Sequence, residues 1–468
     1  MNNSTSTSLF NRVYQSTKRI SPEQIKMPVL KILISALTIL AGSGALFAQV
    51  PVPAPPQTGP IALTGATIHT VSGSTIEGGI LLFDAGKIVA VGKSIEIPAG
   101  ATTFDLTGRH IYPGMFEAHS QLGLTEISSV NATIDHSETG ALNPNVKAVV
   151  AVNPDSELIP VTRAGGVLLA VTAPTGGLIS GKSAVIQMDG WTYEDMTLLA
   201  DSAMHLNWPS SAPSRRRRAA PEGEGENRTG DAIRQLRELF EQARNYEKLR
   251  AEAGTSQSFD LRLEGIVDVT SGRVPMMVRA DQLNDIQAAV AFAAEQKVRI
   301  IILGGYDAPL CADLLKKHDV PVIVSAVYRN PMRRGDPDDH AYSLPRRLHE
   351  AGIRFCISCT DRSENWNTRT LPLHAGAAIA FGLPAEEALK AVTLYPAQIM
   401  NVANRVGSIE AGKDATIIVT DGDPLDTRTH VTAAYIQGRP IDLSSKHTRL
   451  FEKYKKKYEQ PGHIPPGL

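Results

Sequence analysis

Residues 112–123 include side chains that could do chemistry. The segment runs Tyr-Pro-Gly-Met-Phe-Glu-Ala-His-Ser-Gln-Leu-Gly and places His119 and Gln121 two residues apart in a run with strand character. Side chains two residues apart on a strand point to the same face, so these two would lie together at the end of the strand. An imidazole there can move a proton or hold a metal ion. A single histidine is more often structural, so His119 needs partners from elsewhere in the chain.

The three cysteines are predicted to be core residues and not a redox pair. Cys356 and Cys359 form a Cys-x-x-Cys spacing within an apolar, strand-like run, and Cys311 is interpreted in the same way. Three strand steps separate the pair by roughly 10 Å, beyond the roughly 4.4–6.8 Å between Cα atoms that a disulfide tolerates. Three cysteines in 468 residues also exclude a disulfide scaffold and a cysteine-rich zinc cluster.

Charge and composition exclude several classes of protein. The 47 Lys and Arg residues nearly balance 48 Asp and Glu, leaving a net charge of −1. Binding of nucleic acid through bulk positive charge is therefore excluded. With 42% hydrophobic and 20% charged residues, the chain is globular, neither disordered nor collagen-like. At roughly 150 residues per domain the length suggests about three domains, but an α/β barrel can reach roughly 250 residues, so two are equally consistent.

The N-terminal part has the layout of a secretory signal. Lys26 and Lys31 precede an uncharged run over residues 32–47, which ends in small residues before a Pro-rich stretch. A membrane span needs about 20 apolar residues, and this run is shorter and contains Ser and Gly, so no stable span is expected. We predict a signal region over residues 1–48, with Met27 as an alternative start, and export to the periplasm or another extracytoplasmic compartment.

Both ends of the exported part show short alternating strands punctuated by glycine. One set covers residues 61–112 and the other residues 404–443. Neither set is long enough to bury a sheet face alone. We therefore expect them to pair into one discontinuous β-sandwich built from both chain ends.

Between these ends, strand and helix patterns alternate. Strands are expected at 111–116, 166–172, 274–278, 298–303, 320–325 and 353–358, and helices at 281–296, 307–317 and 340–351. The later strands start about 22 to 33 residues apart, the spacing of βα units in a parallel sheet. No Gly-x-Gly-x-x-Gly turn follows the first strands, which favours a barrel over an open sheet. The prediction is an α/β fold with a (β/α)8 TIM-like barrel over residues 113–403.

The segment at about residues 208–230 belongs to neither pattern. Four arginines at 215–218 are followed by an acidic run, and a charged helix is expected at 231–252. We predict a solvated, disordered insertion in the barrel. A basic binding patch is the alternative, but the acidic run beside it would neutralise its field.

Several segments resemble the amidohydrolase superfamily, in particular its imidazolonepropionase-like members. In that family a strand after Pro-Gly ends in Asp-x-His-x-His, and here Glu117-Ala-His119-Ser-Gln121 follows Pro113-Gly114. Further similar segments are Asp105-Leu-Thr-Gly-Arg109, Ala164-Gly-Gly-Val167, Leu394-Tyr-Pro-Ala397 and Gly407-Ser-Ile-Glu-Ala-Gly-Lys-Asp-Ala415. The resemblance covers about residues 61–443 and implies a barrel with a composite β-sandwich.

The resemblance also implies a divalent metal such as zinc at the ends of the barrel strands. The family's ligands are two histidines on the first strand, a carboxylated Lys or a Glu, two later histidines, and an Asp. His119 matches the first histidine, whereas Gln121 stands at the second. Arg279 and Gly304 stand where the later histidines are expected. Asp361, in Ser-Cys-Thr-Asp, resembles the family's Thr-Asp and is the expected general base and ligand.

The matching residues form an incomplete set of metal donors. Zinc is usually held by three or four strong donors, and a neutral amide oxygen is weak. Arg279 adds a fixed positive charge where a cation would sit, and could instead pair with Asp361 or a substrate carboxylate. We expect His119 and Asp361 to do acid–base work and to be the remaining weak metal candidates, while Arg279 and Gln121 bind substrate. Glu264 is the nearest match to the bridging residue, and a poor one.

Two functions compete. The resemblance implies an exported hydrolase acting on carbon–nitrogen, non-peptide bonds of a small molecule, with an altered or metal-poor site. The alternative is a non-catalytic extracytoplasmic binding or scaffold protein that retains the fold, and the lost ligands favour it. Retained His119 and Asp361 and an intact fold favour the hydrolase. We favour it because resemblance to a family predicts the class of reaction better than the mechanism. No nucleic acid partner is expected, and the sequence is compatible with a homo-oligomer. A deacetylase of wall sugars would need the missing metal.

Overall fold

A computed structural model of the protein describes residues 52–210, 224–253, 258–359 and 365–460. These residues belong to a unit that runs from Pro51 to Leu468. The expected signal region, the four arginines at 215–218 and Asp361 lie outside the described residues. Across the described ranges, no helix is both long enough and apolar enough to cross a membrane.

The centre of the fold is a curved eight-stranded sheet, in the order β13-β12-β11-β10-β9-β8-β7-β6. Its strands are β6 (Met115–Ser120), β7 (Val167–Thr172), β8 (Ile179–Gln187), β9 (Thr197–Asn207), β10 (Met276–Ala280), β11 (Ile300–Gly304), β12 (Val322–Val324) and β13 (Phe355–Ile357). The two edge strands β13 and β6 also contact each other, so the sheet is nearly closed. The predicted α/β barrel is confirmed.

One strand departs from the regular βα repeat. β8 pairs antiparallel with both β7 and β9, whereas the other neighbouring strands pair in parallel. A parallel crossover needs a dozen or more residues, and the connections on either side of β8 are too short for one. The chain therefore turns back as a meander from β7 to β9. Sequence periodicity predicted neither β8 nor β9, because it looked for helices between strands.

Helices cover the outside of the barrel. They are α3 (Leu158–Ala164), α4 (Tyr193–Met196), α5 (Glu224–Ala253), α6 (Leu261–Thr270), α7 (Leu283–Gln296), α8 (Ala312–Lys317), α9 (Leu344–Glu350), α10 (Leu371–Ala380), α11 (Ala385–Ala391) and α12 (Leu394–Ile399). A further helix, α13 (Lys446–Glu459), contacts α3 and buries none of its own residues. The sequence of α7 explains how such a helix packs on the barrel. Its apolar residues recur at helical spacing, so Ile286, Val290 and Ala293 lie on one side and are buried against the sheet.

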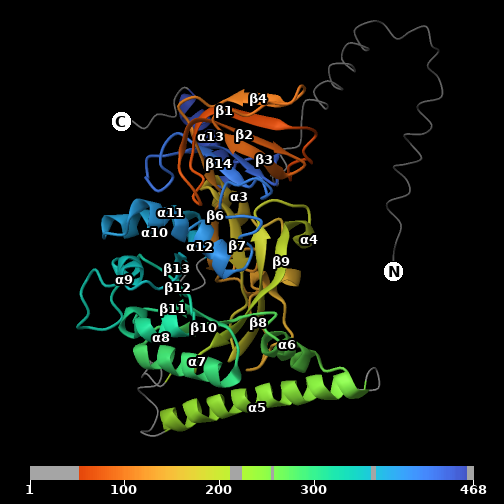
Figure 1. Cartoon of the computed structure of the whole chain (residues 1–468), viewed down its shortest axis with the longest axis vertical. Coiled ribbons are helices and arrows are strands. Elements are labelled where there is room, and N and C mark those ends of the chain that lie inside the picture. The colour runs from red at the N-terminus through yellow and green to blue at the C-terminus, as the bar shows by residue number, and fades with distance from the viewer. Residues whose placement is uncertain (1–51, 211–223, 254–257, 360–364, 461–468) are drawn as a thin grey trace, which may run out of the picture. The chain divides into compact units, whose positions relative to one another are not determined.

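The long helix α5 lies where the insertion was expected. It runs beside α7 in Figure 1, and the Phe240 ring packs edge-on against Phe292 of α7 with centroids 5.6 Å apart. Trp208, at the start of the predicted insertion, is buried and also packs on Phe292. Because α5 begins at Glu224, the helix starts inside the segment that was predicted to be disordered, while residues 211–223 lie outside the described ranges.

Strands from both ends of the described unit form a second sheet, in the order β16-β15-β14-β5-β1-β2-β3, with β4 paired to β1. The strands are β1 (Ile61–Ile68), β2 (Ile76–Asp84), β3 (Lys87–Gly92), β4 (Thr102–Asp105), β5 (His110–Pro113), β14 (Ile417–Thr420), β15 (Val431–Ile436) and β16 (Arg439–Pro440). β14 pairs antiparallel with β5, and in Figure 1 the blue strand β14 lies beside the orange strands of the N-terminal set. The hydrogen bonding makes one continuous sheet.

A glycine carries the chain from this sheet into the barrel. β5 ends at Pro113 and β6 begins at Met115, and Gly114 between them donates its N–H to the Thr416 carbonyl at 3.0 Å. A Cβ at Gly114 would lie 2.8 Å from the Leu168 side chain, so no larger residue fits. The composite sheet therefore fixes the start of β6, and with it the position of His119 at the far end of that strand.

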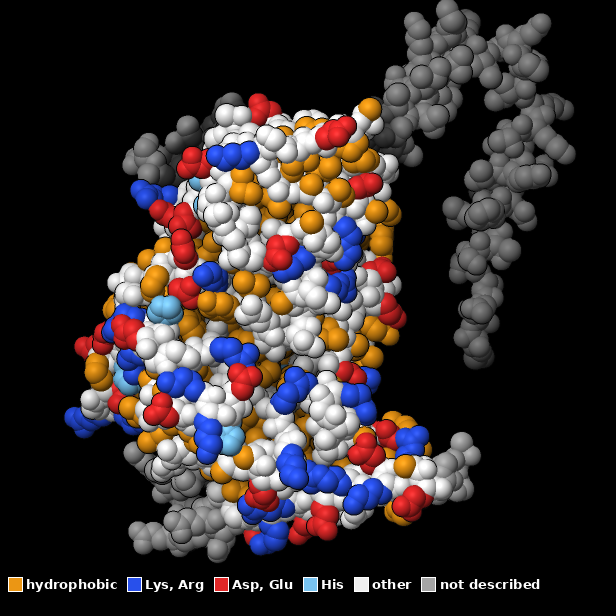
Figure 2. Space-filling view, in the orientation of Figure 1, with side chains coloured by type: hydrophobic (Ala, Val, Ile, Leu, Met, Phe, Trp, Pro, Cys, Tyr) orange, Lys and Arg blue, Asp and Glu red, His pale blue; other side chains and the backbone are white. Residues whose placement is uncertain are grey.

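The surface in Figure 2 carries basic and acidic side chains in alternation. Lys and Arg are interspersed with Asp and Glu over the face drawn, as the nearly balanced composition leads one to expect. That face therefore offers no broad field of one sign to a polyanion.

Candidate functional site

Two histidines face each other at the carboxyl end of the barrel, the end where active sites of such barrels lie. His119 comes from the end of β6 and His205 from the end of β9, and their ring centroids are 5.7 Å apart. His205 is level with Met277 in the β9–β10 ladder, and Met277 belongs to the cluster that fills the barrel interior. Both imidazoles are buried, and the position of His205 beside Met277 places it on the inward face of the barrel.

Sequence reasoning missed His205, although the sequence held a signal. Ala203, His205 and Asn207 alternate along β9, and Ala203 lies in the interior cluster, so His205 shares its inward face. β9 is the fourth strand of the barrel counted from β6. The resemblance assigned no site residue to this strand.

Burial keeps the His205 ring neutral. Loss of solvation, followed by the charge of Arg279, lowers the pKa of His205 to about 3. Its Nε2 is buried and finds no hydrogen-bond partner among the described residues. A neutral imidazole of this kind can donate to or accept from a water or a ligand, but it is a weak base.

A buried carboxylate ties the first barrel strand to the last. Glu117 Oε1 accepts the backbone N–H of His119 at 3.0 Å, and Oε2 accepts the backbone N–H of Cys359 at 3.1 Å and its thiol at 2.9 Å. Ser358 Oγ donates to the His119 carbonyl at 3.3 Å. Burial raises the pKa of Glu117 to about 6, against the lowering effect of these hydrogen bonds. The three cysteines are free and buried, as predicted, but Cys359 is also part of this contact.

The remaining predicted site residues of β6, β10 and β11 lie at the same end of the barrel. Gln121 directly follows β6 and is almost fully buried. Arg279 is close enough to His205 for its charge to lower the histidine's pKa. Gly304 ends β11 beside Ala280. Next to them, the Asp281 carboxylate faces Arg329 at 3.7 Å. The structure thus brings together His119, Gln121 and Arg279, while Asp361 lies outside the described residues.

An ordered loop after β12 stands beside these residues. The buried Asp307 carboxylate accepts two hydrogen bonds from Arg333, at 2.6 and 2.7 Å. Arg333 also contacts Asp336, which accepts from the Tyr306 hydroxyl at 2.8 Å. Arg329 lies over the Tyr306 ring at 5.5 Å. Bidentate pairing of this kind fixes geometry, so the loop that carries Arg329 is held in place.

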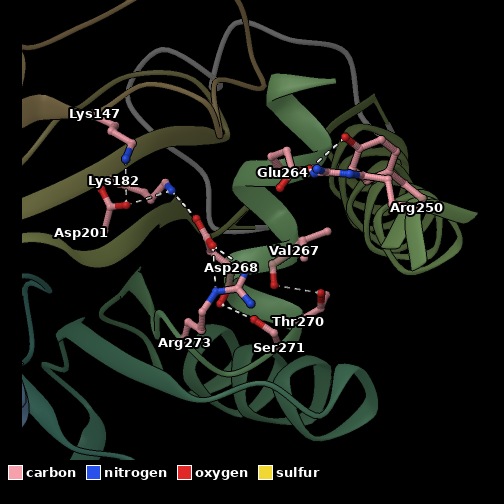
Figure 3. Close-up of polar contacts among 11 residues, drawn as sticks. Lys147, Lys182, Asp201, Arg250, Glu264, Val267, Asp268, Thr270, Ser271 and Arg273 are labelled. Atoms are coloured by element: carbon pink, nitrogen blue, oxygen red, sulfur yellow. Dashed lines mark hydrogen bonds and ion pairs between the residues drawn. The ribbon is translucent and has the colours of Figure 1, made fainter. Parts of the chain in front are cut away.

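Glu264 does not reach the barrel mouth. It lies on α6, outside the barrel, where it accepts from the Tyr246 hydroxyl at 2.9 Å and pairs with Arg250 (Figure 3). The weak match of Glu264 to a bridging residue is therefore wrong. No pattern around Glu264 in the sequence indicated that this segment forms a helix outside the barrel. Lys182 on β8 is no substitute, because its amine turns outward to Asp268 at 2.5 Å and Asp201 at 3.2 Å (Figure 3).

The described residues do not fit a two-metal centre. Three or four strong donors are needed even for one zinc ion, and the described part of the chain holds no group of three or more His, Cys, Asp or Glu residues arranged for a metal. Glu117 and Cys359 are occupied with each other and with backbone groups. The Arg279 charge that disfavours a protonated His205 would also oppose a bound cation.

Comparisons with known proteins point to one family. The model of the amidohydrolase family matches residues 285–445. The structure of an amidohydrolase from Thermotoga maritima MSB8 superposes with a TM-score of 0.73 at 26% identity, over 82% of this chain and 99% of that one. An imidazolonepropionase of Bradyrhizobium diazoefficiens is 22% identical over 386 residues, 74% of this chain and 88% of its own length.

A barrel that is nearly closed between β6 and β13 and continues into a sheet from both chain ends defines an amidohydrolase-type fold. The chain belongs to the amidohydrolase superfamily, as the resemblance of its motifs predicted. Amidohydrolase tasK of Hapsidospora irregularis is 24% identical over 409 residues, which are 79% of this chain. The chain spans only 41% of the length of that relative.

Proposed function

We propose that the protein is an exported hydrolase that cleaves a carbon–nitrogen, non-peptide bond in a small molecule at a metal-poor site. The observation that carries this proposal is the pair of buried histidines, His119 and His205, whose ring centroids lie 5.7 Å apart at the mouth of the barrel. Superfamily membership supports the reaction class, and the relatives named amidohydrolase and imidazolonepropionase agree with it.

Each group at the mouth has a distinct role in this proposal. His119 accepts a proton from the attacking water and passes it to the leaving nitrogen. His205 stays neutral, because its pKa is lowered to about 3, and orients the water or the substrate by a hydrogen bond. Arg279 pairs with a carboxylate of the substrate, where a planar guanidinium can form two hydrogen bonds. Asp361, assigned from the resemblance, supplies the second acid–base group, and Gln121 contacts the substrate.

Turnover of a matched panel of amides tests the reaction class. The panel contains imidazolonepropionate, chosen for the relative of that name, and N-formyl and N-acetyl amines with and without a carboxylate. His119→Asn and Asp361→Asn should each abolish hydrolysis. Arg279→Gln should raise KM about 10- to 100-fold for carboxylate substrates alone, since a hydrogen bond to a charged group contributes about 1.5–3 kcal/mol. Arg428→Gln is the control, because Arg428 is exposed and lies between β14 and β15 of the second sheet, outside the barrel.

Elemental analysis tests the metal-poor part of the proposal. The purified protein should hold well under one tightly bound transition metal per chain, and its hydrolysis should survive a chelator. Two equivalents of zinc in the unmodified protein would overturn this part and would mean that other residues of the chain supply the ligands.

A binding protein is the second candidate, and Arg279 is the observation that favours it. An arginine in place of a metal-binding histidine removes Lewis-acid chemistry but keeps an anion-binding group. Saturable binding of a carboxylate amide, lost in Arg279→Gln and accompanied by no turnover, would favour this candidate over the hydrolase.

Export is tested separately from chemistry. N-terminal sequencing of the mature protein should begin between Leu46 and Val50, after the run at 32–47. An intact Met1 or Met27 on a cytosolic form would contradict export and would leave the proposed reaction untouched.

A further inference from the structure

The last helix, α13, exposes an apolar face. None of its residues is buried, yet Leu450, Phe451, Tyr454 and Tyr458 are 39%, 65%, 50% and 50% exposed. Leu450, Tyr454 and Tyr458 recur every four residues, and Phe451 is one residue from Leu450 and three from Tyr454, so all four lie on one side of the helix. Within the described residues, all four side chains of this side are exposed.

The rest of the helix is strongly basic. Lys446, Arg449, Lys453, Lys455, Lys456 and Lys457 stand against only Glu452 and Glu459, although the whole chain has a net charge of −1. At about 100° per residue, Lys453 and Lys457 border one edge of the apolar side and Lys455 borders the other. The amines of Lys453 and Lys457 lie 5.8 and 5.2 Å from the centroids of the Tyr454 and Tyr458 rings. Lysines thus flank the aromatic side chains.

The first turn of α13 fastens the helix to the rest of the described protein. Ser445 and Thr448 form a capping box, and Arg449 pairs with Glu157, next to α3, at 3.1 Å. Contact between α13 and α3 accompanies this pair. The contacts to the rest of the protein therefore lie in the first turn of the helix. The later turns carry exposed aromatic side chains and lysines.

We propose that α13 binds an anionic lipid surface, with Leu450, Phe451, Tyr454 and Tyr458 at the acyl boundary and the lysines at the headgroups. A helix with a narrow apolar side, lysines along its edges and aromatic residues has the composition of interfacial membrane helices. A second copy of the helix would bring two sets of lysines together. A nucleic acid duplex would engage the lysines but leave the apolar side in water. The proposal does not depend on the proposed function.

Vesicle binding by the unit Pro51–Leu468, which contains all three buried clusters of the fold, tests this proposal. Cosedimentation should be at least tenfold stronger with vesicles containing about 30% phosphatidylglycerol than with phosphatidylcholine alone. Raising the salt from about 0.1 to about 0.5 M should weaken binding to the anionic vesicles. Equal or absent binding to the two kinds of vesicle would overturn the proposal.

Two sets of variants separate the two faces of the helix. Lys453→Gln with Lys457→Gln, and Leu450→Ser with Tyr454→Ser, should each reduce vesicle binding about tenfold or more. Both should leave the melting temperature unchanged, because α13 has no buried residue. Lys316→Gln with Lys317→Gln, on exposed lysines of α8, is the matched control and should retain binding. A concentration-dependent dimer that the serine variant abolishes, or duplex DNA binding without vesicle binding, would overturn the proposal.

Discussion

At the scale of single residues, Glu117 explains how the candidate site is held together. Its two carboxylate oxygens accept donors from positions 119 and 359, which are far apart in sequence but adjacent where the sheet closes. The carboxyl group is buried, so each of these hydrogen bonds offsets part of a large desolvation cost. Glu117 therefore acts on His119 through the backbone, as a positioning residue.

Replacing Glu117 with Gln should lower the free energy of unfolding by about 1–3 kcal/mol, because an amide nitrogen would then face one of the N–H donors. Urea denaturation at pH 7 measures this. Glu238→Gln, on an exposed position of α5, should change the free energy by less than about 0.5 kcal/mol. Equal effects of the two changes would show that the contacts of Glu117 are unimportant for closure.

His374 should make stability depend on pH. It lies on α10, where Nδ1 accepts the Val327 N–H at 3.1 Å, and burial lowers its pKa to about 4. The unfolded chain, with an ordinary histidine pKa, binds the proton first as pH falls, so stability present at pH 7 is lost on acidification toward pH 4. Between pH 7 and 5 this histidine should account for a loss of about 2 kcal/mol.

The comparison of His374→Asn with the wild type isolates this contribution. Asn keeps an acceptor for the Val327 N–H but does not titrate, so the variant should lose about 2 kcal/mol less than the wild type between pH 7 and 5. Urea midpoints at the two pH values give the difference. His318→Asn, at an exposed position, should follow the wild type; a wild-type pH dependence in His374→Asn would contradict the assignment.

At the scale of elements, the parts that sequence predicted are those with a repeating local pattern. β10 to β13 and α7 to α9 were predicted within a few residues, because each apolar strand is followed by a helix of its own. Periodicity predicted neither β8 nor β9, because no long helix separates them; the resemblance indicated only a third strand region at Pro174–Gly181, at the start of β8. His205 lies on β9, so the missed element also hid a site residue. The Glu117 contact to Cys359 could not be predicted, since it depends on closure of the sheet.

Gly304, at the end of β11, should tolerate no side chain. Its φ is +109°, and an added Cβ would lie 2.7 Å from Asp281 Oδ1. Gly304→Ala should cost about 2–4 kcal/mol, from backbone strain and this clash together. A histidine at Gly304 would meet the same obstacle, so restoring a metal ligand there would also distort the barrel mouth.

Gly272→Ala is the control that separates strain from contact. Gly272 also has a positive φ, +77°, but an added Cβ would meet nothing within 4 Å. Its substitution should cost about 1 kcal/mol, the part due to backbone conformation. Urea denaturation measures the free energy of unfolding of both variants. Equal decreases would show that the Asp281 side chain moves aside at little cost and that the clash does not contribute.

At the scale of the whole molecule, the parts of the chain before and after residues 211–223 are joined in both sheets and in the helices around the barrel. β5 pairs with β14 in the composite sheet, β9 pairs with β10 in the barrel, and Lys182 of β8 reaches Asp268 of α6 (Figure 3). The pairing of the two chain ends could be predicted from strand lengths, because neither set could bury a face alone. The partner strands could not, since register is set by contacts far apart in sequence.

Cleavage between the halves should therefore leave one particle. Trypsin cleaves after arginine, and the four arginines at 215–218 offer adjacent sites within a segment that its sequence predicts to be solvated. The two fragments remain joined by the β5–β14 and β9–β10 ladders, whose buried side chains keep the surface area of both interfaces out of water. Digested protein should elute from gel filtration at the volume of the intact chain and separate only in denaturant.

Two results would contradict this picture. Early cutting within β1 to β3, with the arginines uncut, would contradict the assignment of the insertion. Fragments that separate in native buffer would contradict the pairing of strands from both parts of the chain in the two sheets.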